Sequence, residues 1–421
     1  MRFRFWLLLS LLAGGTACLY MSRILGPWEH YIDVKSGKLK AQMGDLYPRW
    51  VGTRELLLHG RNPYSPEVSH EIQMAFYGHA IDQQYGPGMP VIDEQRFVYP
   101  VYVVFLLAPV VYLEFSQVQI LAAILFGVLT AISVILWMEV LRWRPPKALV
   151  LAIALFVLSS PQIVQGLRLR QLGLVVAFLL AVSAWCIVRN HLAIAGMLIA
   201  ISTIKPQMVV LPLAWFLLWA ANAWSKRWPL LAGFGATLAA LTGLGEFVLP
   251  GWPRYFVDGL IAYRKYFPTT SLLCLALGNW VGGVLTGIAI VALFALAWRN
   301  RRVGASSAEF VHTLAAFLIG AAVILPLFQP FNQVLLLLPV TMVVRDWPSL
   351  SRLGRRIFAA VVVWPWIVSL MLLLVFHPRV DSTDRVPLLP SVMTLFVPFL
   401  LLLLLATRLV LPSERADLRL P

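Results

Sequence analysis

Residues 117–141 read QVQILAAILFGVLTAISVILWMEVL, and the basic hexapeptide RWRPPK of residues 142–147 follows directly. A helix crosses a bilayer core with about 20 predominantly apolar residues, so this run is long enough to span a membrane. Short loops rich in Lys and Arg are typical of the cytoplasmic side of such proteins. The apolar run and its basic loop together predict an integral membrane protein.

The composition of the whole chain extends this prediction from one span to many. Of 421 residues, 60% are hydrophobic and 13% are charged, whereas soluble domains have about 45–50% apolar and about 25% charged residues. The apolar residues suffice for roughly twelve spans of about 20 residues. Such a composition excludes disordered, collagen-like, disulfide-rich secreted and soluble enzymatic classes. We therefore expect an all-α polytopic membrane protein, folded as a single membrane domain over residues 1–421.

The basic loops between the apolar windows determine the expected topology. The windows are 5–25, 99–115, 117–141, 148–162, 171–188, 191–204, 207–224, 228–250, 272–298, 308–326, 331–345, 357–376 and 390–410. The strongly basic stretches are 2–4, 142–147, 226–227, 299–302, 345–356 and the tail from 408. All of them face the cytoplasm only if window 99–115, which contains Pro100 and Pro109, is a re-entrant or surface segment. We therefore predict roughly twelve spans in the plasma (inner) membrane, with both termini cytoplasmic.

The net charge of +15 results from 34 Lys+Arg against 19 Asp+Glu, and the basic loops that set the topology account for it. The basic residues are scattered through short loops, so they orient a membrane protein, and we expect no nucleic-acid partner. The basic and apolar N-terminus is similar to a secretory signal, but the many spans that follow favour a retained first helix. Three cysteines, Cys18, Cys186 and Cys274, lie in separate segments without a CxxC motif, which argues against disulfide and zinc sites.

A long outer loop, residues 27–116, separates the first span from the next. Within it, residues 44–60 read GDLYPRWVGTRELLLHG, with apolar residues at near-helical spacing, Pro48 in the first turn and Gly60 as the cap. The tripeptide Ser-Pro-Glu at 65–67 opens a second helix. We expect both helices to be amphipathic and to lie on the outer membrane face.

Asp45 stands directly before the first of these helices. A carboxylate at this place is able to accept a proton from a hydroxyl and so raise its nucleophilicity. The alternative is that Asp45 only caps the helix. The remaining outer carboxylates are expected to be solvated loop residues: Glu55, Glu67, Glu71, Asp82, Asp93 and Glu94.

Several outer cations break the positive-inside pattern and are candidates for binding phosphate. Arg168 and Arg170 share a short outer loop, where their spacing aims them either at one site or in opposite directions. Arginine suits phosphate through its bidentate fork. Lys205 lies at an outer helix end in apolar sequence; it either binds substrate or snorkels to the interface. Arg49 and Arg54 lie near Asp45 on the expected helix, and either one is placed to orient Asp45 or to contact a sugar or phosphate.

The run GDLYPRWVGTRELLLHGRNPYSPEV, residues 44–68, resembles the first outer loop of glycosyltransferase family 87. That family shows an Asp, an aromatic residue and an ALL-x-G-x-x-PY block at this spacing, and here Tyr64 completes the PY pair. Three further segments resemble the family in the same order: FVYP at 97–100, SPQ to QLGL at 160–174, and IKPQ at 204–207. The similarity covers roughly residues 40–215 and is weaker to about 340. The family belongs to the GT-C superfamily of integral-membrane glycosyltransferases.

One segment departs from the family pattern. Many members carry SPxSW-x-HH in a late outer loop, whereas residues 325–333 read LPLFQPFNQ here. The role of those histidines is either absent or taken by Asn332 or Gln333.

The resemblance implies an inverting transfer of a sugar from a polyprenyl-phosphate donor to a lipid or glycan acceptor at the outer face. Mannose is the first expectation for the sugar, and arabinofuranose is the second. Asp45 would be the catalytic base. The donor phosphate and the substrate would be bound by Arg168, Arg170, Lys205, Arg49, Tyr64 and Asn332. Because no HxxxH, HxH or DxD pattern is present, we expect no metal and no cofactor, and full activity in excess EDTA.

Two other classes fit a chain of this kind. A transporter or lipid flippase commonly has twelve spans with both ends inside, but the long outer loop and the lack of inverted repeats argue against it. A polymerase or ligase of surface polysaccharide would place its large outer loop late in the chain.

Overall fold

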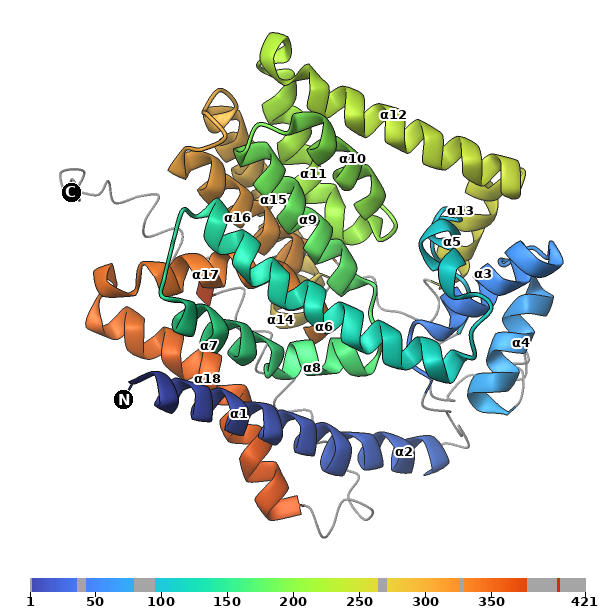
Figure 1. Ribbon diagram of the computed structural model, residues 1–421, viewed down its shortest axis with the longest axis horizontal. Helices are drawn as coiled ribbons and strands as arrows, with labels where there is room; N and C mark the ends of the chain where they lie inside the picture. Colours follow the sequence, from blue (N-terminus) through green and yellow to red (C-terminus); the bar gives the residue numbers. More distant parts are fainter. Residues whose placement is uncertain are drawn as a thin grey trace.

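The computed structural model describes residues 2–35, 43–78, 95–263, 271–325, 329–376 and 400–401, and within these ranges all regular structure is helical. The described helices are α1 (Arg2–Tyr20), α2 (Gly26–Lys35), α3 (Tyr47–His59), α4 (Pro66–Tyr77), α5 (Val103–Leu107), α6 (Phe115–Val140), α7 (Lys147–Leu158), α8 (Pro161–Arg168), α9 (Gly173–Val188), α10 (Leu192–Ser202), α11 (Pro206–Ala221), α12 (Trp224–Val248), α13 (Trp252–Tyr263), α14 (Leu272–Leu277), α15 (Asn279–Asn300), α16 (Ala308–Ile324), α17 (Leu337–Arg345) and α18 (Arg352–Phe376). Figure 1 shows their arrangement.

Among the described residues, five helical stretches are long and apolar enough to cross a membrane. They are Leu7–Trp28, Phe115–Val140, Trp224–Val248, Asn279–Asn300 and Arg352–Leu374. The bent pair α7 and α8, which meet at 62°, makes a sixth if both cross as one span. The described part of the protein is therefore all-helical, as expected of a multi-pass membrane protein. The predicted count of twelve is not confirmed, and all of the last window, 390–410, except 400–401 lies outside the described residues.

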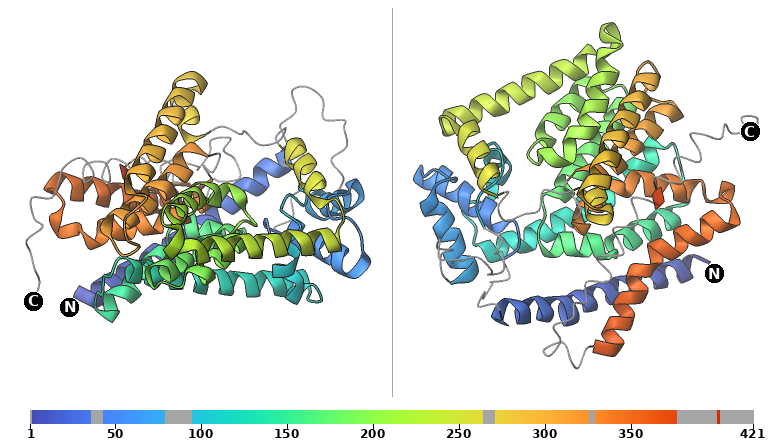
Figure 2. Two further views of the ribbon diagram at one scale, coloured as in Figure 1. Left: turned by 90° about the horizontal axis from the view of Figure 1, so that it is seen from above. Right: turned by 180° about the vertical axis from the view of Figure 1, so that it is seen from behind.

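The shorter apolar helices form the buried centre of the molecule. α9, α10, α11 and α16 have between 10 and 17 residues, fewer than the ~20 of a straight crossing. α16 is buried almost throughout, and its Phe310 packs on Trp219 of α11 with ring centroids 5.0 Å apart. By contrast, only 11% of the apolar window of α12 or of α15 is buried. These two long helices lie at the outside, where lipid would cover their exposed apolar side chains (Figures 1 and 2).

Glycine allows α10 and α12 to approach each other closely. A Cβ on Gly196 would lie 2.1 Å from the Leu230 carbonyl oxygen, and one on Gly233 would lie 2.3 Å from the Ala193 carbonyl oxygen. Small residues at such crossings let helix backbones meet, as is common between membrane helices. The α10–α12 pair therefore depends on glycine at both positions.

Several basic loops converge at one end of the bundle, which we call the basic end. Arg189, after α9, pairs with Glu139 of α6 at 2.9 Å between Nη2 and Oε2. Arg345 Nη1 donates to the carbonyl of Leu141 at 3.3 Å. The structure thus brings the loops after α6, α9 and α17 together.

Arg227 connects two more loops at the basic end. Its guanidinium donates to the carbonyls of Trp219 and Val303, each at 2.7 Å, and covers the Trp219 ring at 3.8 Å. Lys226 next to it lines a shallow hollow together with His191. The loops predicted to share one side of the membrane therefore lie side by side, with the loop before α12 and the loop after α15 among them.

The opposite end carries the helices of the long outer loop and α13 (Figure 1). The capping signals in the sequence are confirmed: Pro48 lies in the first turn of α3, and Gly60 ends α3 in the left-handed region at φ 66°. Ser65 accepts a hydrogen bond from the Val68 amide at the start of α4. Whether α3 and α4 rest on a membrane surface stays a prediction.

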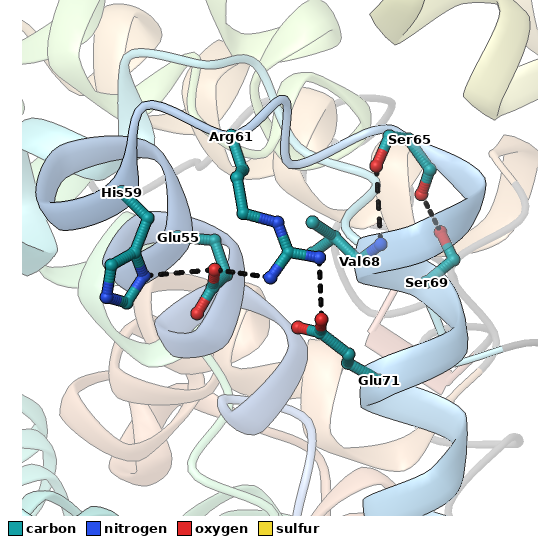
Figure 3. A network of polar contacts seen from close by, with 7 residues as sticks. All are labelled: Glu55, His59, Arg61, Ser65, Val68, Ser69 and Glu71. Carbon is teal, nitrogen blue, oxygen red and sulfur yellow. Dashed lines mark hydrogen bonds and ion pairs between the residues drawn. The ribbon is translucent and has the colours of Figure 1, made fainter.

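Arg61 holds α3 and α4 together (Figure 3). It pairs with Glu55 of α3 at 2.9 Å and with Glu71 of α4 at 2.6 Å, and His59 also contacts Glu55. The expectation that Glu55 is a solvated loop residue is wrong, because its side chain is only 12% exposed and pairs with both basic groups.

Window 99–115 does not form one long helix. It contains α5 and a 3₁₀ turn over Ala108–Val110, and α6 begins at Phe115. A five-residue helix rises about 7.5 Å at 1.5 Å per residue, far less than the ~30 Å of a bilayer core. Val101, Val103 and Val104 are fully buried. The re-entrant placement of this segment stays a prediction.

Candidate active site

Asp45 lies in a turn that is attached to a distant loop. Its amide donates to the Leu169 carbonyl at 2.8 Å. The preceding Gly44 has φ 68°, and a Cβ there would come within 2.9 Å of the same Leu169 oxygen, so glycine is required for this approach. The N-cap residue of α3 is Leu46, not Asp45. In the described structure, no amide of the first turn of α3 donates a hydrogen bond to the Asp45 carboxylate. The capping alternative for Asp45 is therefore wrong.

Gln171 joins Asp45 to two of the other predicted site residues. Its Nε2 donates to Asp45 Oδ2, and its Oε1 accepts a hydrogen bond from Lys205 Nζ at 3.2 Å. Lys205 Nζ also donates to Asn332 Oδ1 at 3.0 Å. The structure thus brings Asp45, Lys205 and Asn332 into one polar cluster, and Gln171 is its central member.

Three helix N-termini meet around this cluster. Asp45 precedes α3, Gln171 precedes α9, and Lys205 is the N-cap residue of α11. Helix N-termini carry partial positive charge, which stabilises carboxylates and other anions nearby. Gly173 keeps α9 close to the cluster, since a Cβ there would lie 3.2 Å from Lys205 Nζ. Asn332 comes from a 3₁₀ segment, Pro330–Leu336, that packs against α8 and α9.

Lys205 is deeply buried between α10 and α11, with 5% of its surface exposed. Burial lowers the pKa of its ammonium from 10.5 to about 7, while the nearby Asp45 charge opposes this shift and Arg49 adds to it. Two protons of the ammonium are used by Gln171 and Asn332, and the Phe331 ring lies 5.3 Å from Nζ. The snorkelling alternative does not fit this inward-bound amine.

Arg49 holds the main chain of Asp45. Its Nη1 donates to the Asp45 carbonyl at 2.7 Å, and its guanidinium covers the Tyr99 ring at 4.6 Å. Arg49 Nε is buried without a hydrogen-bond partner. Burial is the main reason that the pKa of Tyr99 is raised; the Arg49 charge opposes this rise and the Asp45 charge adds to it. Arg49 therefore orients the turn that carries the carboxylate.

Tyr64 reaches the cluster only through its neighbours. Its hydroxyl donates to the Tyr99 carbonyl at 2.5 Å, and its ring packs against Phe97 and stacks on Tyr255 of α13. Burial raises the pKa of the Tyr64 phenol. Tyr64 therefore contacts the segment that contains Tyr99, whose ring Arg49 covers. A contact between Tyr64 and the substrate stays a prediction.

Arg168 and Arg170 lie on either side of Leu169, the residue that binds the Asp45 amide. Arg170 has a left-handed backbone, φ 52°, and its Nη1 donates to the Arg168 carbonyl, while its Nε is buried without a partner. Burial, together with the nearby Arg168 charge, lowers the pKa of Arg170. The Arg168 guanidinium lies near Gly26 at the start of α2. The two arginines are thus close enough to repel each other, beside the Asp45 turn.

No signal in the sequence indicates a role for Gln171, although it opens the QLGL segment at 171–174. A neutral amide carries no charge signal, and the contact partners of this residue are far away in sequence. The structure also distinguishes Asn332 from Gln333: Asn332 binds Lys205, while Gln333 contacts Gln162 of α8 at 3.5 Å.

No group of three or more His, Cys, Asp or Glu side chains gathers within the described ranges. Asp82, Asp93 and Glu94 lie outside them. The three cysteines are described and are not joined in disulfides. Metal independence stays a prediction.

Comparison with known proteins identifies one family. The family model of glycosyltransferase family 87 matches residues 97–311, slightly more than half of the 421 residues. The matched range contains Arg168, Arg170, Gln171 and Lys205, while Asp45 and Asn332 lie on either side of it. No curated protein and no solved structure matches the sequence.

Proposed function

Since the chain belongs to glycosyltransferase family 87, it is a membrane glycosyltransferase, and we propose that its donor is a polyprenyl-phosphate sugar. The acceptor is a lipid or glycan, and the transfer inverts the anomeric configuration. Mannose is the first candidate for the sugar, followed by arabinofuranose. Family membership favours this activity over the transporter or flippase alternative.

The observation that supports the mechanism is the half-buried Asp45 carboxylate, bound on one oxygen by Gln171 and close to Lys205. An acceptor hydroxyl attacks the anomeric carbon from the face opposite the phosphate, and Asp45 takes the hydroxyl proton. The bond between the anomeric carbon and the phosphate oxygen breaks, and the lipid phosphate leaves as an anion. No separate acid is needed, because a phosphate monoester is a stable leaving group.

The cations beside Asp45 would stabilise the charge that develops on the phosphate. Lys205 uses two of the three ammonium protons for Gln171 and Asn332, which leaves one for a phosphate oxygen. Arg168 and Arg170 repel each other, so a bound phosphate between their guanidinium groups would relieve that repulsion. These assignments predict that the donor phosphate lies near residues 168–171.

We further propose that the active site faces outward from the plasma (inner) membrane and that both termini are cytoplasmic. The basic end and the Asp45 cluster lie at opposite ends of α9, which has 16 residues and is about 24 Å long. If the basic end faces the cytoplasm, as the positive-inside rule predicts, Asp45 lies at the outer face.

The test is transfer by purified protein offered a panel of polyprenyl-phosphate sugars, with Asp45→Asn as the decisive variant. Removing a general base lowers kcat by about 10²–10⁴-fold, while inserted and folded protein should be recovered in normal yield. Glu67→Gln is the control, because Glu67 is an exposed outer carboxylate that opens α4. Near-normal transfer by Asp45→Asn would contradict the base assignment. Failure of the native protein to consume any polyprenyl-phosphate donor would contradict the donor class.

A further inference from the structure

We propose that Gln171 is a positioning residue that orients the Asp45 carboxylate for proton abstraction by bonding to Asp45 and Lys205 at once. The inference rests on the proposed function in one respect, namely that Asp45 is the base. Gln171 carries no charge, and its position in the sequence does not indicate this role.

The chemistry of the two partners fixes the orientation of the amide. A lysine ammonium only donates hydrogen bonds, so the amide oxygen of Gln171 has to face Lys205. The NH₂ group then faces the Asp45 carboxylate, which accepts. Either partner alone would determine this orientation, and both require the same one. The amide is therefore held at both of its polar ends.

The backbone of Gln171 is equally constrained. Its amide donates to the Gly166 carbonyl at 2.9 Å, and its own carbonyl accepts from the Leu174 amide at 3.1 Å. Its side chain is buried, with 5% of the residue surface exposed. In the same loop, the Leu169 carbonyl binds the Asp45 amide at 2.8 Å. Residues 169–171 thus hold Asp45 at two points, one on its main chain and one on its carboxylate.

The position of the amide between two opposite charges has a chemical consequence. Without Gln171, Asp45 and Lys205 would be drawn into a direct ion pair, with the carboxylate turned toward the amine. The intervening amide occupies Oδ2, whereas Oδ1 makes no hydrogen bond to the described residues. That oxygen is available to accept the proton of the acceptor hydroxyl. Lys205, Arg49 and Tyr99 lie close to Asp45, and Arg168 and Arg170 flank the Leu169 carbonyl that binds its amide.

The first experiment compares Gln171→Met, which preserves length and removes both hydrogen bonds, with Gln165→Met on α8. Misplacing a reacting group by about 1 Å lowers kcat by about 10²-fold, so we expect a loss of this order with the donor KM unchanged. Gln165→Met should match the native enzyme.

A second variant covers the case in which Gln171→Met fails to fold. Gln171→Glu has nearly the same shape but places a carboxylate against Asp45, so the two like charges should repel, the base should lose its orientation and kcat should fall. Thermal unfolding in detergent verifies that each variant is folded. An unchanged kcat in folded Gln171→Met or Gln171→Glu would overturn the inference.

The third readout does not depend on transfer. At constant pH, the carboxylate stretching band of Asp45 can be assigned as the infrared band that Asp45→Asn removes. In Gln171→Met this band should shift in frequency, because Oδ2 has lost its hydrogen-bond donor, and an unchanged band would overturn the inference. If Gln171→Met and the native protein differ in this way but the native protein consumes no polyprenyl-phosphate sugar, the proposed function alone is contradicted. The two failures are therefore distinguishable.

Discussion

Arg49 connects the turn that carries Asp45 to the aromatic segment below it, through the Asp45 carbonyl and the Tyr99 ring. Lysine has no planar fork, so it cannot bind the carbonyl and cover the ring in the same way. We expect Arg49→Lys to lower kcat by about tenfold or more, since small displacements of a reacting group strongly reduce rate. Transfer kinetics on the purified variant measure this effect.

Arg54 provides the matched control, since it lies on the same helix and covers a ring, Trp50, at 5.3 Å. Arg54→Lys should retain native kcat because Arg54 makes no bond to the Asp45 turn in the described structure. Equal losses in Arg49→Lys and Arg54→Lys would show that the effect arises from α3 as a whole.

Lys205 should titrate near neutral pH. Burial disfavours the charged form, so the amine binds its proton less tightly in the folded protein than in water, and its pKa falls to about 7. The ammonium is therefore present below that pH and is lost as the pH rises through it. Reductive ¹³C-methylation followed by NMR should show one resonance, absent in Lys205→Arg, with a midpoint near neutrality. A midpoint close to 10.5 in the folded protein would contradict the burial argument.

Three residues of the cluster could be predicted from sequence, because each carries a visible signal. Asp45 and Lys205 are charges in unusual places, and Asn332 lies where the related family has histidines. Gln171 could not be predicted, because a neutral amide has no such signal. The orientations of Arg168 and Arg170 could not be predicted either, since they depend on the left-handed backbone of Arg170.

At the scale of elements, the contact between α10 and α12 gives a test within one helix. Gly233→Ala places a Cβ against the Ala193 carbonyl, whereas Gly235 has nothing within 4 Å of its Cβ position. Overpacking costs about 1–3 kcal/mol, so Gly233→Ala should lower the Tm in detergent. Gly235→Ala should leave the Tm unchanged or raise it, since alanine favours helix by about 1 kcal/mol over glycine. A lower Tm in both variants would contradict the close approach.

The helices of the outer loop were predictable because their ends carry local signals. Pro48, Gly60 and Ser65 determine the ends of α3 and α4 through contacts within one turn. Ser160 carries a similar signal, because it caps α8 and precedes a proline. The apolar run obscures this cap, so window 148–162 was expected to be one span and the bend of 62° between α7 and α8 was not predicted.

Apolarity alone cannot divide a long window or set the length of a crossing. Window 272–298 was expected as a single span, but Gly278, at φ 80°, separates α14 from α15. The short helices α9, α10 and α11 are as apolar as the long ones, yet neighbouring helices bury most of α9 and part of α10 and α11. Which apolar face meets lipid and which meets protein depends on contacts between distant segments.

At the scale of the whole molecule, the scattered basic residues behave as a group. Contacts of Arg189, Arg227 and Arg345 tie loops from different parts of the chain into the basic end. The Asp45 cluster lies at the other end of α9, close to Lys205, Arg49, Arg168 and Arg170. The charge pattern in the sequence therefore predicted which loops lie together, while the number of spans depends on helices too short to be identified by length.

This arrangement predicts opposite labelling of two single-cysteine variants. Cys18, Cys186 and Cys274 are first replaced by Ser. Glu67→Cys at the start of α4 and Lys226→Cys at the basic end then each introduce one exposed thiol. A membrane-impermeant maleimide applied to intact cells should label Glu67→Cys, because the positive-inside rule places the basic end in the cytoplasm. Lys226→Cys should react only after permeabilisation. Labelling of both thiols in intact cells would contradict the separation of the two ends, and the reverse pattern would place the Asp45 cluster on the cytoplasmic face.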